Sequence, residues 1–429
     1  MRIVHFTNNL IDGAGKAAYQ LHQALLKHGI DSLMLVLTAG LKDPTVVELK
    51  PDNGASLIRN KIAWKVNAVR SSPRCLFNFN IPFVTWEGIQ VLLKDVDIVC
   101  LYSIQAFLSS NLIRKIYLET KAPIVWTPLD IEPMTGGCHF NSGCMNFSRD
   151  CGNCPQLARG KADDISKRTL LQKKNDLKGF PITLVAGSSW AERCIKESSL
   201  FGANNVKNIL LGVDEKIFSK VDKELARKHL QLPQDKKLIL FGAFNLKDKR
   251  KGGEYLVAAL ERLQNRLLTA GEDCRDSVVM VTMGRQNGFH IEGLSFEHIH
   301  FGEIRDDKKL ACAYQAADVL AVPSMDDFGP MMINQAFMCE TPVVAFHVGV
   351  APDLIKTKQA GFLAQNFSAD DFSLGLNQCL FEKNDQVDDI SQALREVCRS
   401  ATQANRYISL FQEIRNRQSL REDGQLSLV

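Results

Sequence analysis

The sequence predicts an α/β protein of two doubly wound domains, each a parallel sheet with helices on both faces. Two observations favour this class. Short apolar runs alternate with segments of helical periodicity along most of the chain, and this alternation starts twice, near residues 3 and 238. A charged stretch, 215–237, precedes the second series. Ligands of such sheets bind at the carboxyl ends of the strands, so we expect a site in a cleft between the two domains.

Composition excludes several other classes. The chain has 429 residues, enough for two or three domains at roughly 150 residues each. Hydrophobic residues make up 45% and charged residues 23%, which excludes a disordered chain, a coiled coil and a collagen-like repeat. The net charge is 52 − 48 = +4, too small to indicate nucleic-acid binding but compatible with docking on an anionic membrane face.

The compartment is predicted from the start of the chain and from its cysteines. The first residues have the pattern of a strand and lack the features of a secretory signal, and no apolar run reaches the roughly 18 residues of a bilayer span. We therefore expect a cytoplasmic protein. Its 12 cysteines are too sparse for a disulfide scaffold, so clustered ones indicate metal or chemistry and scattered ones core packing.

The first domain is expected over residues 1–211. A strand at 3–6 leads through a small-residue loop, 8–15, into a helix that ends near Gly29. Further strands are expected at 32–37, 96–101, 124–127, 182–186 and 208–211. A cysteine-rich loop, 138–154, follows the strand expected at 124–127.

The second domain is expected over residues 212–400, and a linker at 211–214 marks the break between the domains. Its strands are expected at 238–243, 278–283, 299–301, 319–322 and 343–346. The remaining residues, 401–429, are polar with a helical spacing of apolar side chains. We expect this tail to form a helix that packs back on the first domain.

Two segments are informative about the family: 126–140, continuing at 151–156, and 323–335, continuing to 344. Both resemble family 4 of the retaining glycosyltransferases, in the branch that builds bacterial exopolysaccharide and O-antigen chains. The resemblance covers roughly residues 1–400. It implies the GT-B fold, two Rossmann-like domains facing a central cleft. It also implies a UDP- or GDP-linked sugar donor, a glycan or lipid-linked acceptor, and no metal at the donor diphosphate.

The family motif of two glutamates separated by seven residues corresponds to Asp327 and Gln335. By this resemblance Asp327 contacts hydroxyls of the donor sugar and Gln335 contacts the ribose. Gln335 keeps a carbonyl acceptor but lacks the charge that strengthens such bonds. Between them a helix is expected to begin, and a helix start attracts anions through free amides and its dipole. The residues of this predicted diphosphate-binding start are Phe328, Gly329, Pro330, Met331 and Met332.

Two basic residues are predicted to stabilise the diphosphate. Lys251 matches the family lysine at this position. Relatives carry an arginine where this chain has Leu246, so Arg250 is our substitute for that cation. A solvated surface cluster is the alternative interpretation. Across the cleft, the family places the loop containing Gly13 and Gly15 near the phosphate, although this loop lacks the third glycine of a dinucleotide fingerprint.

Two histidines of the family are missing, because Leu129 and Tyr102 stand in their places. Asp130 and Glu132 remain as candidates to orient the acceptor or to act as a base. These departures support a second hypothesis, a non-catalytic partner in a glycan-assembly complex.

The cysteine cluster has the spacing Cys138-x5-Cys144-x6-Cys151-x2-Cys154. Four thiolates suit a tetrahedral, structural zinc ion, and His139 could replace one of them. Two disulfides or plain thiols are the alternatives. A zinc-ribbon nucleic-acid binder is disfavoured, because the cluster lies inside an α/β domain and the net charge is only +4.

A basic segment, 58–75, interleaves cations with apolar residues and could rest on anionic lipid at the inner face of the membrane. A solvated helix is the alternative. Its cations are Arg59, Lys61, Lys65, Arg70 and Arg74.

Overall fold

The computed structural model describes residues 1–50, 58–59, 61–62, 65, 77–271, 277–289, 291, 293–382 and 392–422. The chain forms two compact units. The first comprises residues 1–210 together with 403–429, and the second comprises residues 211–402. Most of the basic segment 58–75 lies outside the described residues, so its predicted membrane contact stays a prediction.

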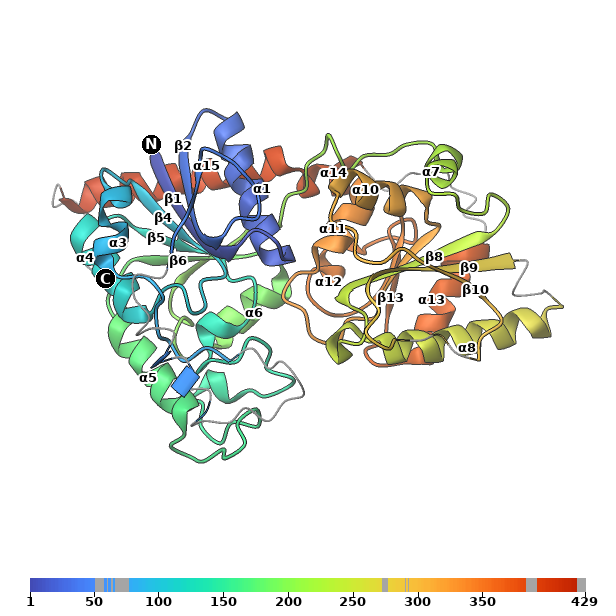
Figure 1. Cartoon of the computed structure of the whole chain (residues 1–429), viewed down its shortest axis with the longest axis horizontal. Helices are drawn as coiled ribbons and strands as arrows, with labels where there is room; N and C mark the ends of the chain where they lie inside the picture. Colours follow the sequence, from blue (N-terminus) through green and yellow to red (C-terminus); the bar gives the residue numbers. More distant parts are fainter. Residues whose placement is uncertain are drawn as a thin grey trace. The chain divides into compact units, whose positions relative to one another are not determined.

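The first unit is built on a seven-stranded sheet in the order β3-β2-β1-β4-β5-β6-β7 (Figure 1). Every neighbouring pair is parallel. This is the strand order of a doubly wound Rossmann-like domain. Successive strands are added outward on one side from β1 to β3 and on the other side from β4 to β7, so the order of winding reverses between β1 and β4. The strands are β1 (Arg2–Asn9), β2 (Asp31–Thr38), β3 (Val46–Glu48), β4 (Ile98–Leu101), β5 (Ile124–Trp126), β6 (Ile182–Ala186) and β7 (Asn205–Asn208).

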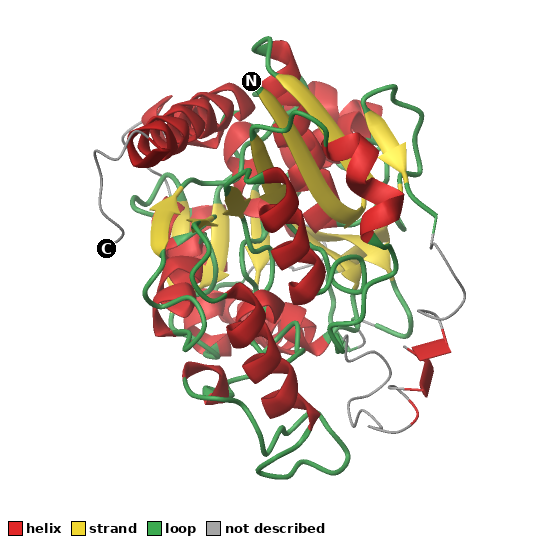
Figure 2. Cartoon of the chain, turned by 90° about the vertical axis from the view of Figure 1, so that its left-hand side faces the viewer, coloured by secondary structure: helices red, strands yellow, loops and turns green. Residues whose placement is uncertain are grey.

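Helices cover the strands of the first sheet (Figure 2). They include α1 (Gly13–Lys27), α3 (Trp86–Ile89), α4 (Ser110–Thr120), α5 (Ile165–Leu177) and α6 (Ser189–Glu197), with short 3-10 turns η1 (Gln90–Leu93), η2 (Glu132–Met134) and η3 (Asn146–Ser148). The last helix, α15 (Ser400–Glu422), adds Tyr407, Leu410 and Phe411 to the same apolar core as Leu21 and Leu25 of α1. The Tyr407 hydroxyl also lies 2.7 Å from that of Thr127, just beyond β5.

The second unit has a six-stranded parallel sheet in the order β10-β9-β8-β11-β12-β13. Its strands are β8 (Lys237–Asn245), β9 (Val278–Arg285), β10 (Glu297–His300), β11 (Val319–Val322), β12 (Val343–Phe346) and β13 (Gly361–Ala364). Its helices are α7 (Lys223–His229), α8 (Gly253–Thr269), α10 (Asp307–Ala316), α11 (Met331–Met338), α12 (Ala351–Leu354), α13 (Ala369–Phe381) and α14 (Gln392–Cys398), with the 3-10 turn η4 (Lys249–Lys251).

The predicted class of two doubly wound α/β domains is confirmed, whereas some element positions are wrong. Strand β7 occupies Asn205–Asn208 and not 208–211. The apolar residues Ile209 and Leu211, which favoured the later position, are buried beyond the end of the strand. The short strands β3 and β13 were not expected. Within the described residues, no helix is long and apolar enough to cross a membrane.

Candidate functional site

The second unit brings Lys251 and Asp327 together, although they are 76 residues apart. Lys251 ends the turn η4 beyond β8, and Asp327 lies in the loop that follows β11. The lysine ammonium forms an ion pair with Asp327 Oδ2, and the other carboxylate oxygen accepts a 3.3 Å bond from the Gly329 amide. A backbone bond of 2.7 Å from Met325 N to Arg250 O fastens the two loops to each other. The pair therefore sits where the carboxyl ends of two neighbouring strands meet, the ligand-binding edge of such sheets.

Helix α11 begins beside this ion pair. Its N-cap residue is Pro330, which makes no side-chain cap bond, so no side chain from that position satisfies the first amides of the helix. Unsatisfied amides and the positive end of the helix dipole are suited to a phosphate. The neighbouring Phe328 is buried and Gly329 has open space around its α-carbon except for Leu211 at 3.8 Å. The region predicted for the diphosphate thus has the geometry of an anion site.

Gly252 determines how closely the loop that carries Lys251 can approach the loop that carries Asp327. Its φ is +70°, in the left-handed region, and a Cβ there would meet the Pro323 carbonyl oxygen at 1.8 Å. Only glycine combines this backbone angle with so close a contact. The lysine beside it is thereby held against the loop that carries Asp327.

The other predicted residues of the second unit have partners of their own. The Gln335 carbonyl oxygen accepts a 3.0 Å bond from the buried Tyr314 hydroxyl. The Arg250 guanidinium pairs with Asp248 at 2.5 Å. Leu246, at the position of the family arginine, is buried in the core and cannot substitute for that residue.

In the first unit, the glycine-rich loop caps its own helix. Asp12 is the N-cap of α1, and its carboxylate accepts a 2.8 Å bond from the Gly15 amide. A Cβ on Gly15 would meet the Asn9 carbonyl oxygen at 1.7 Å, whereas one on Gly13 would meet nothing within 4 Å. Gly15 therefore serves the tight turn, and its amide is already bound. Gly13 remains the predicted contact to a phosphate.

Asp130 lies just beyond β5, in a polar network with His139. The Nδ1 atom of His139 is 2.9 Å from Asp130 Oδ2, and Gln105 Nε2 donates to the same oxygen at 2.8 Å. Sequence reasoning identified Asp130 but gave His139 no role beyond the metal. The two side chains are only 12% and 10% exposed.

The side chain of Glu132 is engaged elsewhere, away from that of Asp130. Its carboxylate accepts a 2.6 Å bond from Lys173 and a 2.8 Å bond from Asn78, and both members of the ion pair are buried. Lys173 also donates to two backbone carbonyls, those of Glu132 and Thr135. This lysine, which sequence reasoning missed, fastens the loop after β5 to α5. Its polar helical context carried no signal of such a role.

The residues that replace the family histidines belong to the core. Leu129 packs against the apolar core of the first unit. Tyr102 is buried, with its hydroxyl 2.9 Å from His5 Nδ1 and its ring stacked on that histidine. Neither side chain is positioned as a hydrogen-bonding group for a ligand.

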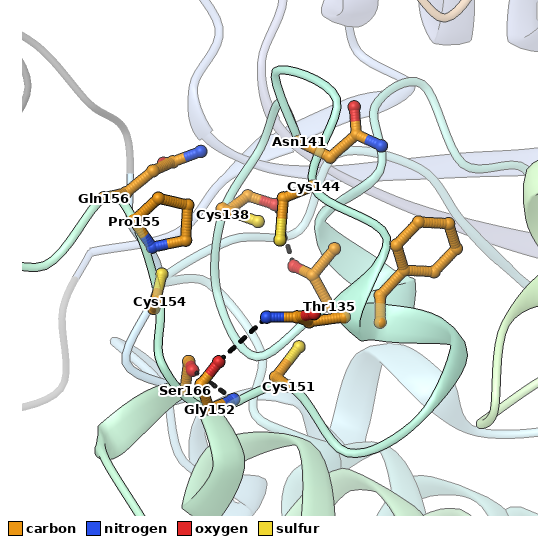
Figure 3. A pocket seen from close by; sticks show the side chains of 12 residues that line it. Thr135, Cys138, Asn141, Cys144, Cys151, Gly152, Cys154, Pro155, Gln156 and Ser166 are labelled. Carbon is orange, nitrogen blue, oxygen red and sulfur yellow. Dashed lines mark hydrogen bonds between the residues drawn. The ribbon is translucent and has the colours of Figure 1, made fainter. Parts of the chain in front are cut away.

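The four clustered cysteines line one small cavity of about 20 Å³ (Figure 3). They are not disulfide-bonded to each other. Burial raises the pKa of the Cys138, Cys151 and Cys154 thiols, that of Cys151 to about 11, so these three are neutral thiols at pH 7. Within the part of the chain that the structure describes, no group of three or more His, Cys, Asp or Glu is arranged to hold a metal ion. His139, the predicted substitute ligand, bonds to Asp130 and does not line this cavity.

Comparison with known sequences finds a family match within the second unit. Residues 235–382 match the model described as "Glycosyl transferases group 1", and this segment contains Lys251, Asp327 and α11. The chain is 28% identical over 173 residues to D-inositol 3-phosphate glycosyltransferase of Mycobacteroides abscessus, a match that covers 40% of the chain and 38% of that relative. It is 24% identical over 241 residues to the putative colanic acid biosynthesis glycosyl transferase WcaC of Escherichia coli K12, covering 54% of each.

The fold is shared over nearly the whole chain. Sucrose-phosphate synthase from Thermosynechococcus elongatus has a TM-score of 0.66 at 17% identity, covering 96% of this chain and 99% of that one. Anabaena HepE in complex with UDP has a TM-score of 0.62 at 15% identity, covering 96% and 100%. The chain thus shares the GT-B fold with these structures, and a segment of its second unit matches the group 1 glycosyl transferase model. The curated sequence matches span only about a third to a half of those relatives' lengths.

Proposed function

We propose that the protein is a retaining glycosyltransferase. It transfers a sugar from a nucleotide-sugar donor to a glycan or lipid-linked acceptor in surface polysaccharide biosynthesis. One observation carries the proposal: the Lys251–Asp327 pair lies beside the start of α11, inside the segment that matches the group 1 family model. A cation, a carboxylate and an anion-binding helix start are what a sugar diphosphate requires.

The reaction breaks the bond between the sugar's anomeric carbon and the diphosphate oxygen, where negative charge develops. Lys251, Arg250 and the start of α11 stabilise that charge, so no divalent metal is needed at the diphosphate. Asp327 orients the sugar hydroxyls and the amide of Gln335 holds the ribose. The departing phosphate oxygen takes the proton of the acceptor hydroxyl, whose oxygen forms the new bond on the same face.

The donor nucleotide in this proposal is UDP, with GDP as the alternative. HepE, which has the same fold, was solved with UDP. The name of WcaC refers to colanic acid, a polysaccharide, which supports a glycan acceptor. The protein would work in the cytoplasm, at the inner face of the membrane, where segment 58–75 would contact lipid.

A non-catalytic partner protein is the second candidate, because the two positions of the family histidines have become core positions. A thermal-shift panel with UDP, GDP, dTDP and ADP, without added metal, separates the two. A ligand present at about 100 times its Kd stabilises the protein by roughly 2.7 kcal/mol. We expect a shift with one nucleotide that Lys251→Ala abolishes, followed by turnover of the matching sugar donor. The partner hypothesis holds instead if millimolar nucleotide of every kind leaves the melting temperature unchanged.

Zinc in the cysteine cavity is a separate part of the proposal. Four cysteines line a cavity of about 20 Å³, but in the described residues they are not arranged to hold an ion, so zinc binding would have to draw their sulfurs together and remove their protons. The protein should then contain about one zinc per chain, held by thiolates, and lose it in Cys151→Ser. Cys312→Ser, in the second unit, is the matched control. Elemental analysis that finds no zinc in wild type would leave these cysteines as neutral packing thiols.

A further inference from the structure

A polar network crosses the carboxyl ends of three neighbouring strands in the first sheet. Asn8 near the end of β1, Ser103 and Gln105 after β4, and Asp130 after β5 contribute to it. The Gln105 carbonyl oxygen accepts a 2.6 Å bond from the Ser103 hydroxyl and a 3.3 Å bond from Asn8 Nδ2. Its amide donates to Asp130, so the chain of bonds ends at His139. In doubly wound sheets this edge is where ligands bind.

The network fixes the orientation of the His139 ring. Asp130 Oδ1 accepts a 2.9 Å bond from the Glu132 amide, while Oδ2 receives Gln105 and faces His139 Nδ1. A carboxylate only accepts, so His139 Nδ1 carries a proton. Nε2 is left as the ring nitrogen for a further bond, which it accepts in the neutral ring and donates in the protonated ring. Among the described residues, Nε2 has no hydrogen-bond partner.

A second atom of the network also lacks a partner. The Asn8 carboxamide oxygen is buried without a hydrogen bond within the described part of the chain. Leaving such an atom unsatisfied is costly, and it is rare in folded proteins unless a ligand or water supplies the partner. The Asn8 oxygen is one of nine buried side-chain atoms without a partner in the described part of the chain, so it does not by itself mark a site. The unbonded Nε2 of His139, at the ligand-binding edge of the sheet, indicates a ligand that carries hydroxyls.

We propose that His139, oriented by Asp130, contacts substrate in the first unit, with Nε2 hydrogen-bonded to a hydroxyl of a sugar, which can donate or accept. This inference rests on the proposed glycosyltransferase function and deepens it. Donor and acceptor share the hydroxyl chemistry, and kinetics distinguish them. Position 129 holds a leucine, and His139 lies ten residues further along the same loop, next to Cys138 of the cysteine cavity.

The test compares two amides at position 139 in the full chain. His139→Asn keeps a group near Nδ1 for Asp130 but removes Nε2, while His139→Gln restores a polar group near Nε2. We expect His139→Asn to lower kcat/KM by about 10- to 100-fold, with partial recovery in His139→Gln. A rise in the KM of the acceptor with unchanged donor hydrolysis assigns the hydroxyl to the acceptor, and a loss of donor hydrolysis assigns it to the donor. The melting temperature and the nucleotide-induced shift should stay at wild-type values.

If His139 had only a structural role, its variants would lower the melting temperature or the nucleotide-induced shift together with kcat/KM. His28→Asn, an exposed histidine of the same unit, is the matched control for the substitution itself. An Asp130→Asn/His139→Asn double variant should be no worse than the poorer single variant, because both changes disable one contact. Wild-type kinetics in His139→Asn would overturn the inference and leave the proposed function standing. A wild-type protein that neither binds nucleotide nor turns over donor would overturn the proposed function itself.

Discussion

Lys251 pairs with a carboxylate that the proposed mechanism also uses, so a bound diphosphate must draw the lysine away from Asp327. The loss of one charge-stabilising group at such a site costs about 10²- to 10³-fold in rate. We therefore expect Lys251→Ala to lower kcat/KM by that factor. Lys249→Ala, two residues earlier and exposed, should keep nearly full activity. Steady-state turnover of the donor identified in the nucleotide panel checks this, and equal effects of the two variants would remove Lys251 from the site.

Gly252 offers a second prediction at the scale of one residue. Gly252→Ala adds a strained backbone angle and a clash with the Pro323 carbonyl oxygen, whereas Gly271→Ala adds only the strained angle, because nothing lies within 4 Å of it. The strained angle costs about 1–2 kcal/mol in both variants. We expect Gly252→Ala to be the more destabilised in thermal unfolding and also to lose turnover. Matching melting temperatures would show that the two loops can move apart freely.

Sequence reasoning identified residues that belong to local motifs and missed those that meet only in the folded chain. The predictions of Asp327, Gly329 and Lys251 rest on the family resemblance and on local patterns of a loop, a helix start and a basic turn, and they stay predictions. The bond from Lys173 to Glu132 spans 41 residues, and nothing around either residue specifies the other. The pairing of His139 with Asp130 was hidden for another reason: the neighbouring cysteines favoured a metal-binding interpretation of that histidine.

At the scale of elements, apolar runs located the central strands and misplaced the edges. Strands β4, β5, β11 and β12 are buried throughout, so their sequences are continuous apolar runs. Edge strand β7 reads Asn-Val-Lys-Asn and is partly exposed, so the apolar residues beyond it drew the prediction three residues too far. Pairing with a single neighbour leaves an edge strand with little sequence signal.

Helix α15 carries a prediction about stability. Phe411 is fully buried in the core of the first unit, and removal of such a side chain costs about 3–5 kcal/mol. We expect Phe411→Ala to destabilise the first unit by that amount. Leu420→Ala, on the same helix but 39% exposed, should change stability by less than about 0.5 kcal/mol.

Tryptophan fluorescence during urea unfolding measures this, because all four tryptophans lie within residues 64–190, in the first unit. A Phe411→Ala transition that coincides with wild type would mean that α15 does not stabilise this unit.

For the whole molecule, the fold class followed from two alternations of strand and helix, whereas the identity of the ligands did not. The core of each domain is built from apolar residues whose periodic spacing can be recognised in the sequence. Donor base, sugar and acceptor depend on side chains from several loops, whose positions are set by long-range bonds such as Lys173 to Glu132. Substrate choice therefore has no compact sequence signature in this chain.

The stability of the first unit should depend on pH through two buried histidines. His5 and His22 are fully buried, their rings 5.6 Å apart, and His22 bonds Ser32 at 2.7 Å and Thr45 at 2.9 Å. Burial lowers the pKa of His22 to about 4 and that of His5 well below its ordinary value. The unfolded chain, with pKa values of about 6.5, then binds more protons than the folded one below that pH. Stability is therefore retained above about pH 6.5 and lost as the pH falls, by at most about 1.4 kcal/mol per pH unit for each histidine.

Urea unfolding followed by tryptophan fluorescence should show a loss of about 1–3 kcal/mol between pH 7.5 and 5.5. His139 acts in the opposite direction: burial lowers its pKa, but Asp130 raises it more, so its net pKa is raised. His22→Gln isolates the effect, because it removes one titrating group and leaves His139 in place. This variant should have a shallower pH dependence, whatever its stability at pH 7.5. An unchanged slope would mean that His22 takes up its proton in the folded state as readily as in the unfolded chain.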